Sequence, residues 1–327
     1  MPEEGSEVEM TGAIPFSKIV EDGLKVIANR ASGKVKPIKT PWEAVNAHMR
    51  GGMWPGLYTL TGNTGSGKTQ WALQIAIEAA KASIPPAFDA RPVDTRPVVY
   101  IALELGDVDM AARGLGLIAN IPHWKIAYPK AEDFADVVAA VEKHTGELRR
   151  LPLLVQIAPP TQWSYENIIT LADLHKPKLL VIDYAQLVAS PNPREDVRST
   201  VGTVAKIGRD IARRHNAAVL ALCSTARANY ARVDGSEKNA KGESAGEALG
   251  KGDPSRLVGL GKESGELEYT ADCALVLGHE PLQKDEKAAV RKSWLAIAKG
   301  RGYGTGWVEM RFDGSRFFEP QTSTVMV

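Results

Sequence analysis

Eight consecutive residues, 62–69, have the types and spacing of a loop that binds phosphate. They read GNTGSGKT, which fits in full the pattern GxxxxGK followed by serine or threonine. Glycines let the backbone wrap closely around phosphate, and the N–H groups of such a loop attract anionic oxygens. Lys68 is expected to reach the β- and γ-phosphates, and Thr69 to hold Mg²⁺. The residues expected to contact the nucleotide are Gly62, Asn63, Thr64, Gly65, Ser66, Gly67, Lys68 and Thr69.

The flanking sequence favours this interpretation over a chance match in a glycine-rich turn. The run GLYTLTG (56–62) predicts a short buried strand before the loop, and QWALQIAIEAAKA (70–82) predicts a helix after it. A strand before the loop and a helix after it are the context in which this motif binds phosphate. The loop therefore predicts binding of a nucleoside triphosphate.

A carboxylate ends a second apolar run, KLLVIDYAQLV (178–188), which predicts a strand. Asp183 is expected at the carboxyl end of that strand, where open α/β sheets place ligand-binding groups. Many buried strands end in aspartate, so the pattern is weak alone. With a phosphate-binding loop upstream, it predicts a residue that holds Mg²⁺ directly or through water.

A further carboxylate, Glu104, lies near the end of VVYIALEL (98–105), which also predicts a buried strand. A buried carboxylate is costly unless it has a role or a partner. One interpretation is a catalytic base, or a group that orients water for attack on the γ-phosphate. The other is a structural salt bridge or a helix N-cap. The residues alone leave both open.

The elements that must position these groups alternate along the chain. Further helices are predicted at 108–120, 132–150, 165–176 and 197–216. Further strands are predicted at 151–158, 217–225, 271–278, 293–302 and 306–314. Alternation of this kind predicts an α/β fold with a mostly parallel, doubly wound sheet. The closing strands are expected as antiparallel additions at one edge, and the polar stretch 226–256 as a mobile loop.

The first residues differ in character from the rest. Residues 1–13 are acidic and polar, and we expect them to be disordered. Residues 16–30 place apolar side chains at helical spacing, which predicts an amphipathic helix. These side chains are Phe16, Ile19, Val20, Leu24 and Ile27. The helix folds back on its own domain or docks on a neighbouring subunit, and the pattern favours neither.

Bulk composition constrains the function only weakly. Lysine and arginine total 40 and aspartate and glutamate 39, so the net charge of +1 argues neither for nor against nucleic-acid binding. Cys223 and Cys273 lie in apolar runs without metal-ligand spacing, which predicts buried thiols in a reduced protein. There is no secretory signal, and no uncharged apolar run reaches about 18 residues. A cytoplasmic protein without membrane contact is predicted.

The three acidic and phosphate-binding motifs, in this order, resemble those of RecA-fold ATPases, and more narrowly those of the DnaB-type replicative helicases. Residues 102–104 read ALE where that family has SLE, and residues 182–187 read IDYAQL where it has IDYLQL. Residues 261–272, GKESGELEYTAD, are similar to its RESGSIEQDAD. Residues 298–314, AKGRGYGTGWVEMRFDG, are similar to its GKQRNGPIGTVRLTFNG. The resemblance extends from about residue 16 to residue 318.

The resemblance implies a RecA-like P-loop ATPase domain at 38–327, preceded at 1–37 by a disordered start and a linker helix. It implies ATP and Mg²⁺ as cofactors and a homohexameric ring in which the linker helix docks on the neighbour. Lys299 and Arg301 match a lysine and an arginine that the family inserts into the neighbouring nucleotide site, where they stabilise charge on the γ-phosphate. Without the resemblance, a basic hairpin on a solvated face would be preferred.

Three departures from the family pattern stand out. The family's N-terminal helical domain is expected to be absent. Residues 221–227 read ALCSTAR where the family has ALSQLNR, so Ser224 occupies the position of a glutamine that senses the γ-phosphate. Serine is shorter, so coupling of hydrolysis to movement is expected to be weakened or rerouted. The loop at 228–255 is longer and more charged than is usual in the family.

The resemblance implies that the loops after Asp183 and Ser224 face the central channel of the ring. Basic residues in them are candidates for contacts with the phosphate backbone of single-stranded DNA. These candidates are Arg194, Arg198, Arg227, Arg232 and Lys241. For each of them a solvated loop charge is an equally good interpretation. Tyr230 is the one aromatic candidate for base stacking in the second loop.

Three functions fit these features. The first is an ATP-hydrolysing hexameric motor that translocates on single-stranded DNA, a DnaB-like helicase. The second is a DNA-binding RecA-like ATPase that acts as a recombination mediator, loader or regulatory switch without unwinding, which Ser224 favours. The third is an ATPase of the same fold that does not act on DNA, such as a circadian-clock or signalling ATPase. The similarity at 261–272 and 298–314 argues against the third.

Overall fold

The computed structural model describes most of the chain. The described residues are 14–85, 94–159, 163–192, 194–233, 250, 252–261, 265–280 and 290–320. Residues 1–13, predicted to be disordered, and Lys241 lie outside them. The contacts divide the chain into two compact units, Met1–Lys36 and Pro37–Val327.

The first unit contains the helix α1 (Phe16–Ala31), which confirms the predicted amphipathic helix and extends it by one residue. Asp22 forms ion pairs with Lys18 at 3.4 Å and with Lys25 at 3.1 Å on the polar face. None of the residues of α1 is buried, and Leu24 and Ile27 are 58% and 60% exposed. Helices with such an apolar face gain most of their stability from a packing partner.

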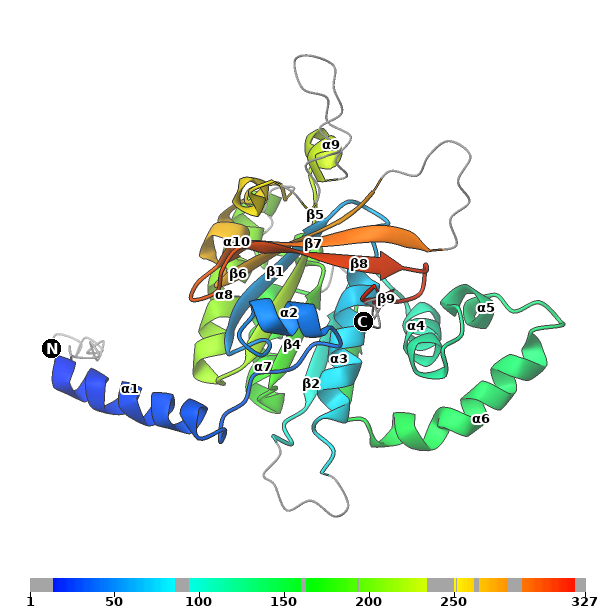
Figure 1. The fold of residues 1–327 in the computed structure, drawn as a ribbon, viewed down its shortest axis with the longest axis horizontal. Helices are drawn as coiled ribbons and strands as arrows, with labels where there is room; N and C mark the ends of the chain where they lie inside the picture. Colours follow the sequence, from blue (N-terminus) through cyan, green and yellow to red (C-terminus); the bar gives the residue numbers. More distant parts are fainter. Residues whose placement is uncertain are drawn as a thin grey trace, which may run out of the picture. The chain divides into compact units, whose positions relative to one another are not determined.

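In its described residues, the second unit is built on a sheet of nine strands in the order β3-β2-β4-β5-β1-β6-β7-β8-β9 (Figure 1). The strands are β1 (Gly56–Gly62), β2 (Val98–Ala102), β3 (Leu153–Ile157), β4 (Leu179–Asp183), β5 (Ala218–Ser224), β6 (Cys273–His279), β7 (Arg291–Gly300), β8 (Gly306–Phe312) and β9 (Phe317–Phe318). The first six strands in that order pair in parallel. The last three pair antiparallel, at one edge, which confirms the predicted arrangement.

The long helices begin and end within two residues of their predicted bounds. The helices of this unit are α2 (Glu43–His48), α3 (Lys68–Lys81), α4 (Asp107–Ala119), α5 (His123–Ala127), α6 (Phe134–Arg150), α7 (Tyr165–His175), α8 (Val197–Arg214), α9 (Tyr230–Val233) and α10 (Gly265–Thr270). The sequence did not predict α2, α5, α9, α10 or β9. Each is too short to show a recognisable periodicity.

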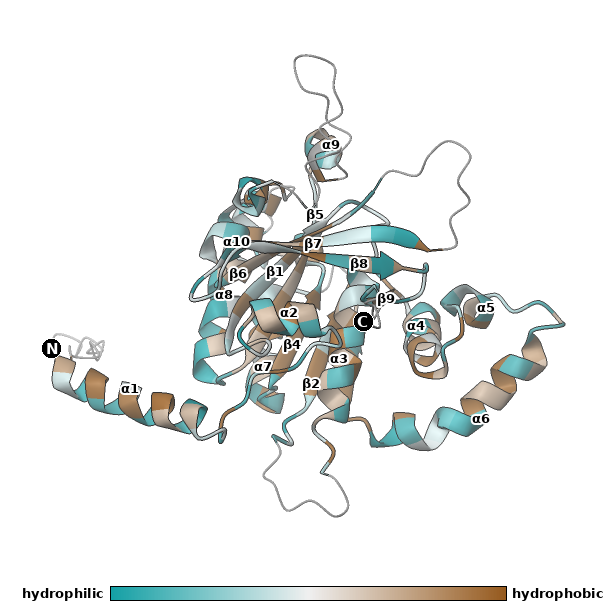
Figure 2. Ribbon diagram, viewed as in Figure 1, coloured by the Kyte–Doolittle hydropathy of each residue, from teal (hydrophilic) through white to brown (hydrophobic). Residues whose placement is uncertain are grey.

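The two faces of the sheet are both covered, because alternate residues of each strand point to opposite sides. Tyr58 and Leu60 of β1 pack in one buried cluster with Trp71 of α3. Leu57 of β1 packs in a second cluster with Val204 of α8. Figure 2 shows apolar strands between these helix layers. The sheet is therefore doubly wound, as predicted.

Two strands end well before their predicted bounds. The expected strand at 98–105 stops at Ala102, and the expected strand at 178–188 stops at Asp183. Ala102 and Asp183 are partners in the last paired register of β2 and β4, after which the two chains diverge. Glu104 lies beyond this point and its side chain is exposed. The prediction that Glu104 belongs to a buried strand was therefore wrong.

The cysteines and the membrane prediction can be checked against the described residues. Cys223 and Cys273 are both buried thiols outside any disulfide, as predicted, and burial raises the pKa of the Cys273 thiol to about 12. Among the helices of the described ranges, none has the length and apolar character needed to span a bilayer. The same residues contain no cluster of three or more histidine, cysteine or acidic side chains suited to a metal ion.

Candidate functional site

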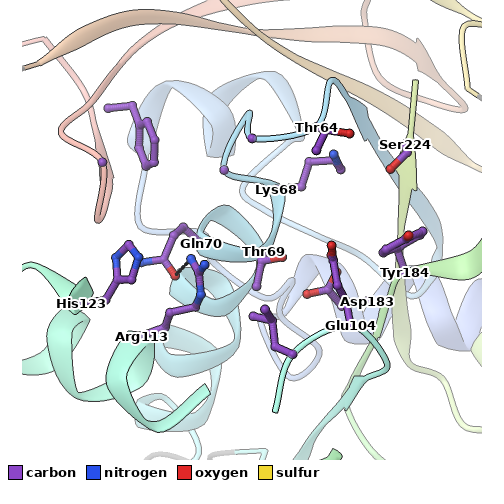
Figure 3. Close-up of a pocket in the computed structure, with 15 residues that line it drawn as sticks. Thr64, Lys68, Thr69, Gln70, Glu104, Arg113, His123, Asp183, Tyr184 and Ser224 are labelled. Atoms are coloured by element: carbon purple, nitrogen blue, oxygen red, sulfur yellow. Dashed lines mark hydrogen bonds between the residues drawn. The ribbon is translucent and has the colours of Figure 1, made fainter. Parts of the chain in front are cut away.

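A pocket of about 380 Å³ opens at the carboxyl ends of the parallel strands (Figure 3). Its walls come from the loop after β1, the helices α3, α4 and α5, and residues at or just after the ends of β2, β4, β5 and β8. Parallel strands bring their carboxyl ends to one edge, so residues distant in sequence meet there. The pocket brings together Lys68, Thr69, Glu104, Asp183 and Ser224.

Residues 62–69 run from the last residue of β1, through the turn that follows it, to the first two residues of α3. Gly65 and Gly67 have φ angles of 77° and 82°, in the left-handed region that favours glycine. A Cβ atom on Gly67 would lie 3.0 Å from the rings of Phe312 and Phe317, so the loop also needs a small residue there for packing. The backbone thus has the close, curved path that the motif predicts.

The predicted loop residues divide into two groups. Those that line the pocket are Thr64, Gly65, Gly67, Lys68 and Thr69. Gly62, Asn63 and Ser66 are not part of the lining. A Cβ atom on Gly62 would lie 2.8 Å from the carbonyl oxygen of Leu277, and Ser66 is buried. This second group supports the loop from behind.

Lys68 points back onto the loop. Its Nζ donates hydrogen bonds to the carbonyl oxygens of Gly62 at 2.8 Å and Asn63 at 3.0 Å. Burial lowers the pKa of Lys68, and the nearby Asp183 opposes that shift. The ammonium group is therefore partly desolvated and stands where phosphate oxygens can replace the carbonyl groups as its partners.

Asp183 is a buried carboxylate with two hydroxyl neighbours. Its side chain is 2% exposed, and Tyr100 donates a hydrogen bond to its Oδ2 at 2.7 Å. Burial raises the pKa of Asp183, whereas hydrogen bonds from Tyr100 and Thr69 act to lower it. Hydroxyl and carboxylate oxygens are ligands that suit Mg²⁺, so the pair formed by Thr69 and Asp183 fits this ion.

Glu104 lies beside Asp183 in the pocket wall (Figure 3). Within the described ranges its side chain has neither a hydrogen bond nor an ion pair, and the N-cap of α4 is Gly106. The N-cap interpretation is therefore wrong, and the salt-bridge interpretation lacks a partner in that part of the chain. Its negative charge acts on both Lys68 and Asp183, so the carboxylate is close to the phosphate-binding groups.

The other end of the pocket is formed by residues that sequence reasoning missed. Arg113 donates from Nη1 to Oε1 of Gln70 at 3.2 Å, and the ring of Phe312 forms part of the wall. Nε of Arg113 and Nδ1 of His123 are buried without a hydrogen-bond partner among the described residues. Burial and the charge of Arg113 lower the pKa of His123. The available signal was the RFDG sequence around Phe312, which carried the resemblance but no assigned role.

Lys299 and Arg301 do not lie in the pocket. The backbone N–H of Arg301 donates to the carbonyl oxygen of Asp272 at 2.6 Å, and its Nη1 is 3.5 Å from Oδ1 of Asp272. Lys299 donates to the carbonyl oxygens of Glu268 and Tyr269, at the end of α10. Figure 1 shows the turn between β7 and β8 beside α10.

The separation of Arg301 from the phosphate-binding loop follows from the strand register. Oδ2 of Asp272 accepts a 2.9 Å hydrogen bond from the N–H of Leu57, at the amino end of β1. The loop begins at Gly62, five residues further along this strand, which is roughly 17 Å. Arg301 therefore lies near the amino ends of the parallel strands, whereas the phosphate-binding loop of the same chain lies at their carboxyl ends.

Ser224 lines the pocket at the end of β5. The backbone N–H of Ser224 donates to Oε1 of Gln186 at 3.4 Å, and Nε2 of Gln186 donates to the carbonyl oxygen of Ser224 at 3.4 Å. These two hydrogen bonds hold the backbone of Ser224 in place. Its side chain is shorter than the glutamine that the resemblance implies at this position. Ser224 contributes one hydroxyl group to the pocket wall.

The candidate DNA-binding residues differ in their exposure and contacts. Arg194, Arg198 and Arg227 are exposed. The side chain of Arg232 is outside the described part of the chain. Tyr230 is half-buried, and its hydroxyl oxygen lies 3.0 Å from Oγ1 of Thr64, so it contacts the phosphate-binding loop.

Comparisons with known proteins agree with this architecture. The model of the family described as DnaB-like helicase C terminal domain matches residues 38–319. One solved structure, of an isolated ATPase domain, is similar over 92% of this chain and 99% of its own, with 18% identity and a TM-score of 0.66. A DnaB-like replicative helicase, solved in a study of its interactions with primase, is similar over 95% of this chain and 67% of its own, with the same identity of 18% and TM-score of 0.66.

The RadB recombinase is similar over 87% of this chain and 100% of its own, with 14% identity and a TM-score of 0.51. No curated protein matches the chain. At these identities the solved structures show the fold, and they confirm the predicted RecA-like α/β class.

Proposed function

Because this chain belongs to the family of DnaB-like helicase C-terminal domains, we propose that it hydrolyses ATP with Mg²⁺ and uses the energy to move along single-stranded DNA. The observation that carries the ATPase part is the convergence of Lys68, Thr69, Glu104 and Asp183 in one pocket. These groups match in type the lysine, hydroxyl and carboxylates that phosphoryl transfer to water requires.

The residues divide the chemistry between them. Lys68 transfers its hydrogen bonds from the carbonyl oxygens of the loop to the β- and γ-phosphates. Thr69 and Asp183 would hold Mg²⁺, which when bound neutralises charge on the phosphate oxygens. Glu104 orients the attacking water and accepts its proton, and its exposed carboxylate beside the other three groups supports this role.

The opposite end of the pocket is left for the nucleoside. The wall there holds a flat aromatic ring, Phe312, and the buried polar atoms of Arg113 and His123 that lack partners among the described residues. Rings and unpaired donors of this kind suit a base and a ribose. We therefore expect ATP to lie with its phosphates at Lys68 and its nucleoside toward Phe312.

The active unit is proposed to be a ring of identical chains, a homohexamer as in the resemblance. The support is the place of Arg301 and Lys299, which stand at the far edge of the sheet from their own pocket. A neighbouring copy can present its pocket to that edge. The exposed apolar face of α1 supports the same assembly, since it suits a linker helix that docks on an adjacent copy.

The second candidate is a DNA-binding RecA-like ATPase that acts as a mediator, loader or switch without unwinding. Ser224 favours it, because its short side chain in the pocket wall replaces the sensing glutamine of the family. A hydroxyl on Cβ has less reach than an amide two carbon atoms further out. Hydrolysis would then change DNA binding without driving movement.

The deciding experiment compares three activities of one preparation: ATP hydrolysis alone, hydrolysis with single-stranded DNA, and strand displacement on a forked duplex. Stimulation by DNA together with displacement is the result expected of the motor. Stimulation without displacement rejects the motor and supports the switch. Hydrolysis without any response to DNA rejects both DNA functions and leaves an ATPase of the same fold.

A further inference from the structure

The phosphate-binding loop is hydrogen-bonded to the segment that follows β5. The N–H of Thr225 donates to the carbonyl oxygen of Gly62 at 3.1 Å. Nδ2 of Asn63 donates to the carbonyl oxygen of Tyr230 at 3.2 Å, and Oγ1 of Thr64 lies 3.0 Å from the Tyr230 hydroxyl. Three successive loop residues therefore hold the start of this segment.

The same loop residues also hold the ammonium group that would bind phosphate. The carbonyl oxygen of Gly62 accepts from both Thr225 and Lys68, and that of Asn63 accepts from Lys68. When Lys68 turns toward a phosphate, both carbonyl groups lose a charged donor. These residues also form the hydrogen bonds to the segment after β5, so nucleotide binding should change the contacts of that segment directly.

Asn63 is joined to the segment after β5 through its side-chain amide. Its Oδ1 is buried and has no hydrogen-bond partner among the described residues, so its amide contact runs through Nδ2 to the Tyr230 carbonyl group. Thr64 lines the pocket and reaches Tyr230 with its hydroxyl. Tyr230 thus touches one loop residue behind the pocket and one in its wall.

The far side of the segment is anchored as well. Ala226 donates to the carbonyl oxygen of Leu260 at 3.1 Å, and Asn229 donates to the same oxygen from its side chain at 3.3 Å. The neighbouring N–H groups of Gly259 and Gly261 donate to Glu268. Because Ala226 and Asn229 are both held by the Leu260 carbonyl oxygen, the segment should respond to a shift of the phosphate-binding loop as a unit.

Glu268 ties this anchor back to the strand that carries the loop. Its carboxylate is 1% exposed and accepts a 2.8 Å hydrogen bond from the hydroxyl of Thr61, the residue before Gly62. Burial raises the pKa of Glu268, and the hydrogen bonds from Thr61 and the glycine N–H groups oppose that shift. The loop, residues 225–230 and residues 259–261 therefore form one connected set of hydrogen bonds.

We propose that Tyr230 is a positioning residue that couples nucleotide binding at residues 62–69 to the segment 227–233. The proposal rests on the proposed function, since it assigns a regulatory contact to the same ATP site. Tyr230 spans from the segment after β5 to Thr64 in the pocket wall. By thermodynamic linkage, whatever binds the segment also changes nucleotide affinity by the same factor.

Hydrogen–deuterium exchange tests the coupling without DNA. In the unmodified protein, a non-hydrolysable ATP analogue with Mg²⁺ is expected to slow amide exchange in residues 227–233 by at least about fivefold. Tyr230→Phe removes one hydroxyl group and should reduce that slowing at least threefold. Tyr128→Phe is the matched control, because Tyr128 follows the short helix α5 and is 76% exposed. This variant should show the same slowing as the unmodified protein.

A double-mutant cycle with Thr64 separates coupling from two independent effects. Thr64→Val should reduce the slowing as Tyr230→Phe does, Thr64→Ser should restore it, and the double variant should lose no more than either single variant. Independent, multiplicative losses would overturn the proposal. The proposal would also be overturned if Tyr230→Phe showed the same slowing as the unmodified protein. It would equally be overturned if the nucleotide did not change amide exchange in residues 227–233 of the unmodified protein.

A DNA arm distinguishes failure of the coupling from failure of the proposed function. The affinity for the analogue is measured with and without an oligothymidylate, in the unmodified protein and in Tyr230→Phe. If the unmodified protein ignores the oligonucleotide, the DNA function is rejected while the exchange result still decides the role of Tyr230. If both proteins respond equally to the oligonucleotide, the DNA function stands and the Tyr230 coupling is rejected.

Discussion

The hydroxyl of Tyr100 donates a 2.7 Å hydrogen bond to Oδ2 of Asp183 on the adjacent strand. Both side chains are buried, and burial raises the pKa of Asp183. The hydrogen bond from Tyr100 opposes this shift, since it favours the ionised carboxylate. Tyr100 therefore helps to keep Asp183 in the form that would hold Mg²⁺.

We expect Tyr100→Phe to raise the Mg²⁺ concentration needed for half-maximal ATP hydrolysis by about fivefold, which corresponds to about 1 kcal/mol. The carboxylate loses a donor and takes up a proton more readily, so excess Mg²⁺ should restore the rate. Titration of the rate with Mg²⁺ measures the effect. Tyr58→Phe, another buried tyrosine whose hydroxyl donates to the carbonyl oxygen of Trp54, is the control and should keep the original Mg²⁺ requirement.

The position of Arg301 predicts complementation between two inactive variants. Arg301→Ala should bind nucleotide but hydrolyse it at least about a thousandfold more slowly, because charge on the γ-phosphate loses its partner. Glu104→Gln should be similarly slow, because the attacking water loses its acceptor. Each retains the group that the other lacks.

When the two variants are mixed in equal amounts and allowed to exchange subunits, about a quarter of the contacts should pair an intact Glu104 with an intact Arg301. The mixture should then recover about a quarter of the rate of the unmodified protein. The double variant mixed with the unmodified protein gives the same proportion of intact contacts and serves as a control for exchange. No recovery despite verified exchange would place Arg301 outside the neighbouring site.

Two glycines of the phosphate-binding loop should respond differently to alanine. Gly65 and Gly67 both have positive φ angles, but a Cβ atom on Gly65 would meet nothing within 4 Å, whereas one on Gly67 would press on Phe312 and Phe317 at 3.0 Å. Gly65→Ala should cost about 1 kcal/mol of unfolding free energy from backbone strain. Gly67→Ala should cost about 2–4 kcal/mol, since overpacking adds to the strain. Urea unfolding without nucleotide gives both values, and equal costs would contradict the packing argument.

His279 should make the fold sensitive to acid. It is 7% exposed, its Nε2 donates to the carbonyl oxygen of Ser66 at 3.0 Å, and burial lowers its pKa to about 4. The unfolded chain binds a proton near pH 6.5 and the folded chain only near pH 4, so the stabilisation is present above pH 6.5 and lost as the pH falls. The expected loss is about 2 kcal/mol between pH 7 and pH 5.

Urea unfolding at the two pH values, with His279→Gln as the comparison, measures this contribution. Glutamine can still donate to the Ser66 carbonyl group but does not titrate, so the variant should lose less stability on acidification by about 2 kcal/mol. Identical pH dependence in the two proteins would show that His279 has the same pKa in the folded and unfolded states.

Ser224 predicts a gain of function. Ser224→Gln would place an amide in the pocket wall, at the position where the resemblance implies a glutamine that senses the γ-phosphate. We expect stimulation of hydrolysis by single-stranded DNA to rise about fivefold, in the range of ordinary coupling energies. Ser224→Asn carries the same amide on a shorter side chain and should give little change. An equal response of the two variants would show that reach is not what Ser224 lacks.

The fold and the phosphate end of the pocket could be predicted because their determinants are local. The glycine pattern specifies the backbone of residues 62–69, and the apolar run before Asp183 specifies a buried strand. The prediction for Glu104 failed on burial because apolar Leu103 and Leu105 extend the strand pattern past Ala102, where the pairing ends. Where two strands diverge depends on the whole sheet, which no local pattern records.

The remaining site residues come from contacts between distant segments. Tyr100 reads as one more apolar residue of β2, and only the register with β4 places its hydroxyl on Asp183. Arg113 and Phe312 reach the pocket from a helix and an antiparallel strand with no motif of their own. Tyr230 was predicted as a base-stacking group, and its contact with Thr64 depends on how the segment after β5 folds back.

The strand register that separates Arg301 from Gly62 also makes each chain directional. In the proposed assembly, one end of the sheet carries a pocket that takes its donor from a neighbour and the other end carries that donor, so copies would join head to tail. A two-fold symmetric pair would bring like ends together and complete neither site. An open row would always have one complete pocket fewer than it has members, and only closure into a circle would complete the pocket of every copy.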